Sequence, residues 1–102
     1  MEEAFKALGD ATRLRIVRML AENGELCVCI IMEQLGMGQS AVSHHMAALR
    51  RAGLLHSRRQ GQWIHYSLNV EAFESGVLAL LNEIAETAKS SAGKQAESAC
   101  CK

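Results

Sequence analysis

The sequence predicts a mainly α-helical domain that carries one β-hairpin. Apolar residues recur at helical spacing before Gly53 and again after Val70, and between these points the period changes to two. The absence of proline from the 102 residues suits continuous helices joined by short loops. A chain of this length is expected to form one domain, residues 1–88, followed by a flexible cysteine-containing tail, residues 89–102.

Two helices are predicted before Gly24. The first covers residues 2–8 and stops at Gly9, and the second runs over residues 11–22 with Asp10 as its N-cap. The apolar face of the second helix is expected to consist of Leu14, Val17 and Leu20 or Ala21. Its arginines are interpreted as a solvated face with one candidate phosphate contact among them: Arg13, Arg15 and Arg18.

The sequence next predicts two helices joined by a tight glycine-containing turn. The third helix is short and closes at Gly36, and the fourth helix begins at Gln39 or Ser40. This arrangement is the helix–turn–helix pattern. The fourth helix is expected to end near Ala52. Its core face would hold Val42, His45, Met46 and Leu49, with His45 as a structural histidine. The opposite face is polar, basic and small, which suits close approach to a DNA groove: Ser40, His44, Ala47 and Arg51.

Alternating residues predict two strands, 55–59 and 62–68, in which Gly61 supplies the positive φ of a hairpin. The hairpin tip would carry Arg58, Arg59 and Gln60 next to the fourth helix, which is the position of a wing.

The last predicted helix, residues 70–88, has more apolar surface than a small domain needs. Packing between two subunits is the natural use of that surface, and a broad core-facing helix is the alternative.

Charge is distributed unevenly along a chain whose formal net charge is zero. The stretch from Gln34 to Val70 contains no Asp or Glu, yet it holds four arginines and all four histidines. A basic segment on an acidic scaffold is typical of a duplex-binding face, and chance clustering on a solvated surface is the alternative.

The chain shows no signal-peptide pattern and no apolar run long enough for a membrane span, so a cytoplasmic protein is expected.

Four cysteines occur in two close pairs, which favours free thiols for metal binding or redox chemistry over a disulfide framework. Cys27 and Cys29 would point about 200° apart on a regular helix but to the same side of an extended backbone. Joint binding of a soft ion would therefore distort the start of the third helix. Two buried small hydrophobic residues are the alternative. The tail pair, Cys100 and Cys101, is within reach of the first pair, or forms a non-functional end.

Four segments in this order resemble the ArsR/SmtB family: ALGDATRLRIVRML, ELCVC, QSAVSHHMAALRRAGLL and RRQGQWIHYSL. The resemblance covers about residues 4–85. It implies a homodimer of αααα-ββ-α winged helix–turn–helix subunits that binds an inverted repeat and dissociates when a toxic metal or metalloid arrives. Two departures from the family pattern are Ile30, where an acidic residue is common, and Met32, where arsenic-sensing members carry a third cysteine.

Together these observations predict a DNA-binding repressor in arsenic resistance and not an enzyme. The expected DNA contacts are Gln39, Ser40, Ser43, His44 and Arg51 in the groove and Arg58, Arg59 and Gln62 on the phosphates. Cys27 and Cys29, with Cys100 or Cys101, would hold As(III), with Sb(III) as a second ligand. The alternatives are Cd(II) or Pb(II), thiol oxidation or persulfidation, and a winged helix that binds protein.

Overall fold

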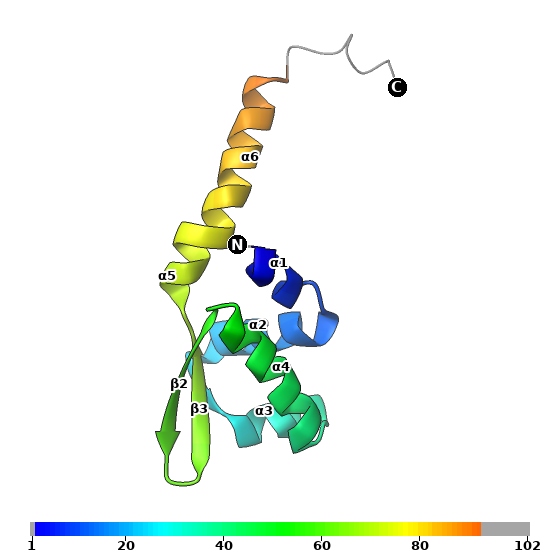
Figure 1. Cartoon of the computed structure of the whole chain (residues 1–102), viewed down its shortest axis with the longest axis vertical. Helices are drawn as coiled ribbons and strands as arrows, with labels where there is room; N and C mark the ends of the chain where they lie inside the picture. The colour runs from blue at the N-terminus through cyan, green and yellow to red at the C-terminus, as the bar shows by residue number, and fades with distance from the viewer. Residues whose placement is uncertain (1, 93–102) are drawn as a thin grey trace.

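The computed structural model describes residues 2–92 and confirms the predicted fold class (Figure 1). Its elements are α1 (Glu2–Leu8), α2 (Ala11–Asn23), β1 (Glu25–Cys27), α3 (Val28–Leu35), α4 (Gln39–Arg51), β2 (Leu55–Gln60), β3 (Trp63–Leu68), α5 (Val70–Ala72), the π-helical turn η1 (Phe73–Val77) and α6 (Leu78–Ser90). The predicted ligands Cys100 and Cys101 lie outside the described residues.

The hairpin belongs to a three-stranded antiparallel sheet in the order β1-β3-β2. Gly61 turns the hairpin with φ of 65°, as predicted. Strand β1 was not predicted, because three residues are too short to show an alternating pattern. It exists through pairing with a distant strand, in which Leu26 lies opposite Tyr66 and Cys27 lies opposite His65.

The core lies where α2, α3 and α4 pack against one another and against the sheet. Its completely buried side chains are Ile16, Leu20, Ile31, Val42, Met46, Leu49 and Leu54. The prediction for α4 is confirmed, with His45 half-buried at the edge of its apolar face. The predicted face of α2 is partly wrong, since Leu14 is 44% exposed and Ala21 is exposed while Ile16 is fully buried. Both apolar faces of α2 have helical spacing, and only the packing partners select one.

The C-terminal helical segment leaves the body of the domain. Figure 1 shows α6 rising away from the sheet and from α2–α4. The π-helical turn η1 interrupts the regular helix predicted for residues 70–88, and the helix continues to Ser90. Large apolar side chains along it are solvent-exposed: Val70 59%, Leu78 48%, Leu81 48% and Ile84 56%. This surface lacks cover within residues 2–92.

Leu49 offers a direct test of the core. Replacing this fully buried side chain in α4 by alanine removes apolar contacts and leaves a cavity, so we expect a loss of about 2–5 kcal/mol in the free energy of unfolding. Urea denaturation followed by circular dichroism measures the change. The exposed Arg50→Ala on the same helix is the control, expected within about 0.5 kcal/mol of the parent. Equal midpoints for the two variants would contradict this packing.

Candidate nucleic-acid interface and cysteine pair

Helix α4 presents the predicted groove-contacting residues on its exposed side. The α3–α4 turn contains Gly36 in the left-handed conformation, with φ of 65°, and Gly38 is the N-cap of α4. The exposed positions are Gln39, Ser40, Ser43, His44 and Arg51, and Ala47 between them is half-buried. This face carries hydrogen-bond donors and acceptors without a negative charge, which suits both base edges and phosphates.

The wing brings the predicted phosphate contacts to the hairpin, where Arg59 and Gln62 are exposed. Arg58 is already engaged: its Nε and Nη2 donate to Oε2 and Oε1 of Glu25, each at 2.9 Å, and its Nη1 donates to Oε1 of Gln60 at 3.2 Å. The hydrogen bond from Arg58 holds the pKa of Glu25 below its ordinary value, and the same bond raises the pKa of Arg58. Glu25 shows no sign of this role in the sequence, because its partner lies 33 positions later in the chain.

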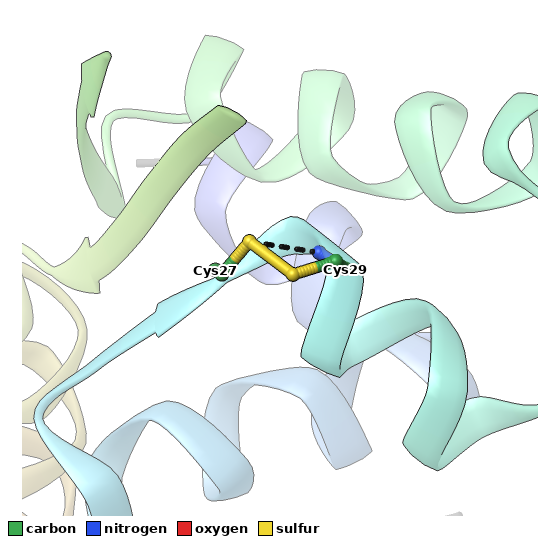
Figure 2. Close-up of a disulfide and its surroundings, with 2 residues drawn as sticks. All are labelled: Cys27 and Cys29. Atoms are coloured by element: carbon green, nitrogen blue, oxygen red, sulfur yellow. Dashed lines mark hydrogen bonds between the residues drawn. A yellow bond between two sulfur atoms is a disulfide. The ribbon is translucent and has the colours of Figure 1, made fainter. Parts of the chain in front are cut away.

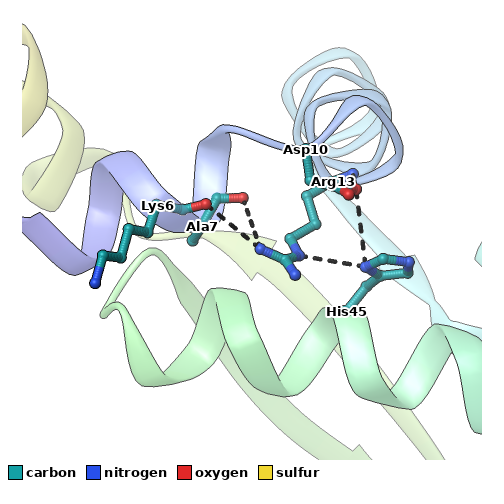
Figure 3. Close-up of polar contacts among 5 residues, drawn as sticks. All are labelled: Lys6, Ala7, Asp10, Arg13 and His45. Carbon is teal, nitrogen blue, oxygen red and sulfur yellow. Dashed lines mark hydrogen bonds and ion pairs between the residues drawn. The ribbon is translucent and has the colours of Figure 1, made fainter.

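Arg13 of α2 connects three elements, namely α1, α2 and α4 (Figure 3). Its Nε donates to Nδ1 of His45 at 3.2 Å, and its Nη1 donates to the carbonyl oxygens of Ala7 at 3.3 Å and Lys6 at 3.5 Å. The prediction that Arg13 lies on a solvated face is therefore wrong. The guanidinium stabilises the carbonyl end of α1, which the local sequence does not reveal.

His45 is confirmed as a structural histidine. Its Nδ1 accepts the hydrogen bond from Nε of Arg13, which ties the edge of α4 to α2. Asp10 caps α2 as predicted, since Oδ2 accepts from the Arg13 backbone N–H at 3.0 Å. That hydrogen bond is the main reason why the pKa of Asp10 is lowered, and His45, whose Nδ1 lies 3.9 Å from Oδ2, is a smaller one.

Cys27 and Cys29 meet at the junction between β1 and α3 (Figure 2). Cys27 ends the strand and is the N-cap of α3 with φ of −67° and ψ of 143°, whereas Cys29 lies in the first helical turn. The Cα atoms are 5.2 Å apart and the sulfur atoms form a disulfide. Cys27 has extended backbone and lies just outside the helix, whereas the distortion of this junction by a bound ion stays a prediction. The prediction of free thiols is wrong for this pair, because the change from strand to helix turns both side chains to one side.

A backbone hydrogen bond at this junction also reaches the sulfur atom of Cys27. The backbone N–H of Cys29 donates to Sγ of Cys27 at 3.2 Å. Both cysteines are half-buried, so a ligand can reach them. Met32 is half-buried against the core, which agrees with its interpretation as a packing residue. Within residues 2–92, no cluster of three or more His, Cys, Asp or Glu side chains is arranged to hold a metal ion.

The folded elements define a winged helix–turn–helix domain. The chain belongs to the ArsR family: the family model described as "Bacterial regulatory protein, arsR family" matches residues 10–57. An uncharacterized HTH-type transcriptional regulator of Methanocaldococcus jannaschii is 42% identical over 82 residues, which cover 80% of this chain and 91% of the relative. The name of this relative is that of a transcriptional regulator.

Two curated relatives carry names that concern toxic metals. The arsenical resistance operon repressor of Escherichia coli is 51% identical over 67 residues, which cover 66% of this chain and 57% of the relative. A cadmium resistance regulatory protein CadC homolog of Staphylococcus aureus is 38% identical over 69 residues, which cover 68% and 57%. The chain thus spans little more than half the length of these two relatives.

Solved structures agree with the fold. A homodimeric winged helix–turn–helix DNA-binding domain of Mycobacterium bovis, a possible ArsR-family regulator, is 32% identical, covers 83% of this chain and 77% of that chain, and has a TM-score of 0.66. Reduced HlyU of Vibrio cholerae is 41% identical, covers 65% and 68%, and has a TM-score of 0.61. Among the described residues, no helix combines the length and the apolar character that crossing a membrane requires.

Proposed function

We propose that this chain represses transcription by binding an inverted-repeat operator as a homodimer, and that As(III) captured by Cys27 and Cys29 releases it. The observation that carries the proposal is the position of the two sulfur atoms at the N-terminus of α3. Helix α3 is the first helix of the helix–turn–helix, and residues 36–38 alone separate it from α4. A ligand that changes this junction therefore acts on the element that supports the DNA-reading helix.

The DNA interface consists of two parts. The exposed face of α4 enters the major groove through Gln39, Ser40, Ser43, His44 and Arg51, and the wing reaches the flanking phosphates through Arg59 and Gln62. Arg58 contacts a phosphate only when its guanidinium has released the carboxylate of Glu25. Two copies related by a two-fold axis would read half-sites about 34–36 Å apart.

The dimer rests on the exposed apolar surface of the C-terminal helix. Leu78, Leu81 and Ile84 are each about half exposed, and such a surface is unfavourable in water. A hollow of about 360 Å³ lies near the end of α6. Leu80, Ile84 and Ala88 are among the residues that line it, and it would accept apolar side chains of a second copy. The homodimeric neighbour from Mycobacterium bovis supports this assembly.

The inducer is a soft thiophilic species. Two thiols on the same side of the backbone fit As(III) or Sb(III), and Cys100 or Cys101 of either subunit would supply a third thiolate. The arsenical relatives support As(III), whereas the cadmium relative supports Cd(II) or Pb(II) as the alternative. In each case the thiols must be reduced before they bind.

Operator binding measured by fluorescence anisotropy tests the proposal. Reduced protein is titrated on an inverted-repeat duplex alone and with arsenite, antimonite, Cd(II) or Pb(II). The thiolate absorbance of each mixture shows how much of the added species the cysteines have bound, and the loss of operator binding is expected to follow that amount. We expect arsenite to weaken binding by at least about tenfold, which corresponds to a coupling of about 1.4 kcal/mol. Unchanged binding in saturating arsenite would refute As(III) as the inducer.

Reversible oxidation of the pair is a second candidate signal. The Cys27–Cys29 disulfide favours it directly, and the similarity to a structure of reduced HlyU points to the same chemistry. Formation of the disulfide removes two electrons and two protons from the thiols, which an oxidant such as diamide accepts. If diamide releases the duplex and arsenite does not, oxidation is the signal.

The wing is tested separately through salt dependence. Arg59→Gln removes one predicted phosphate contact, so it should weaken binding to all duplexes alike and reduce the slope of log K against log salt by about 0.9. The matched control is Lys89→Gln, an exposed cation in the last turn of α6 with the same loss of charge. If both variants show the same slope, Arg59 does not contact phosphate.

A further inference from the structure

We propose that Glu25 is a positioning residue whose bidentate pair with Arg58 ties the wing to the strand that ends at Cys27, so that a change at the cysteine pair reaches the wing. This inference rests on the proposed function and adds a second route to it. The first route runs from the cysteines through α3 to α4. The second runs through the sheet and bypasses the helices.

The sheet register places the connected residues on one face. Arg58 lies opposite His65 on β3, and Cys27 lies opposite the same His65 from the other side. Residues directly opposite one another in an antiparallel sheet share a face, and so do residues two apart on one strand. Glu25, Cys27 and Arg58 therefore share one face, which is the face turned away from buried Tyr66.

The ion pair crosses the middle strand. In the order β1-β3-β2, the outer strands β1 and β2 share no backbone pairing, so the side chain of Arg58 spans β3 to reach Glu25. The ion pair therefore links β1 and β2 directly, independently of the backbone hydrogen bonds that each of these strands makes with β3. The remaining Nη1 of Arg58 holds Gln60 at the end of β2, next to the hairpin turn.

The geometry of the pair suits positioning better than stabilisation. Its two hydrogen bonds of 2.9 Å use the planar fork of the guanidinium and both carboxylate oxygens, which restricts the relative orientation of the side chains. The side chains are 54% and 38% exposed, and solvent screening leaves such pairs little net effect on folding. Loss of the pair should therefore free the wing without unfolding the domain.

Strand β1 is so short that a structural change at its last residue, Cys27, also displaces its first residue, Glu25. Its three residues place Glu25 two positions before Cys27, with Leu26 packed against the core between them. Ligand binding or disulfide formation constrains the junction between Cys27 and Cys29, and the Glu25 carboxylate belongs to the same strand. A shift of this carboxylate reorients Arg58 and, through Gln60, the hairpin.

Trp63 provides the measurement, since it is the sole tryptophan of the chain and begins β3 opposite Gln60. Its side chain is 45% exposed, so acrylamide quenching of its fluorescence reports on the wing. Full-length protein is compared in three states: reduced, oxidised with diamide, and reduced with arsenite. Operator affinity is measured in the same states. The variants are Glu25→Gln, Arg58→Gln and the charge-reversed pair E25R/R58E, with Glu22→Gln as the matched acid-to-amide control.

The expected result is a change in Trp63 quenching between states in the parent and in Glu22→Gln, a loss of this change in both single variants, and its return in E25R/R58E. The ratio of operator affinities between states should fall by about fivefold in the single variants and recover in the pair. Circular dichroism confirms that each variant is folded. If the parent shows no change at Trp63, or if Glu25→Gln retains it, the inference is wrong. The proposed function fails on a different result, namely parent operator affinity that is the same in all three states.

Discussion

Replacing Cys27 and Cys29 together by serine will abolish release by arsenite and leave operator binding within about twofold of the parent. Serine keeps the size of the side chain, but its hydroxyl does not ionise near neutral pH and is a poor ligand for a soft metalloid. Serine is also a favoured N-cap, so the start of α3 at Val28 is preserved. Anisotropy titration with and without arsenite measures the effect.

The cysteine experiment includes two controls. Met32→Leu changes a half-buried packing residue on the same helix and should respond to arsenite like the parent. A chain without residues 95–102 lacks Cys100 and Cys101 and tests the third thiolate, since weaker arsenite binding is expected when two ligands remain. X-ray absorption of the arsenite-loaded protein would then count two sulfur atoms in place of three. Release of the double serine variant at the parental arsenite concentration would show that the inducer binds elsewhere.

Ile84→Glu combined with Leu81→Glu will produce a monomer whose affinity for the inverted repeat is lower by about 100-fold or more. Two carboxylates per subunit at a packed apolar surface are unfavourable, because burial disfavours their charged form and the copies repel one another. A monomer binds one half-site and loses the advantage of two linked contacts. Sedimentation equilibrium measures the mass, and anisotropy on whole and half operators measures the affinity.

Ser90→Glu is the matched control on the same helix. Ser90 lies on the polar side of α6, at least about 120° from each of Leu78, Leu81 and Ile84 at 100° per residue, and it is exposed. It adds a negative charge without touching the apolar surface, so the variant should remain dimeric and bind the whole operator like the parent. A dimeric Leu81→Glu/Ile84→Glu protein would show that another surface joins the subunits.

Features with a local cause could be predicted from the sequence alone. The apolar spacing of Val42, Met46 and Leu49 indicates the buried side of α4, and the positions of Asp10 and Gly61 indicate a helix start and a hairpin turn. These features depend on neighbours within one or two turns of chain, which periodicity and capping rules describe. The close spacing of Cys27 and Cys29 likewise indicates that their sulfur atoms can meet.

Features that depend on distant partners required the tertiary structure. Arg13 looks like one of several exposed arginines until His45, 32 positions later, accepts its hydrogen bond, and Arg58 looks like a free phosphate contact until Glu25, 33 positions earlier, engages it. Strand β1 has no pattern of its own and forms through β3. Local sequence determined which segments fold and which faces they offer. The packing of those segments decided which charges remain free for DNA, because a side chain's partners are set by positions in space that sequence spacing does not encode.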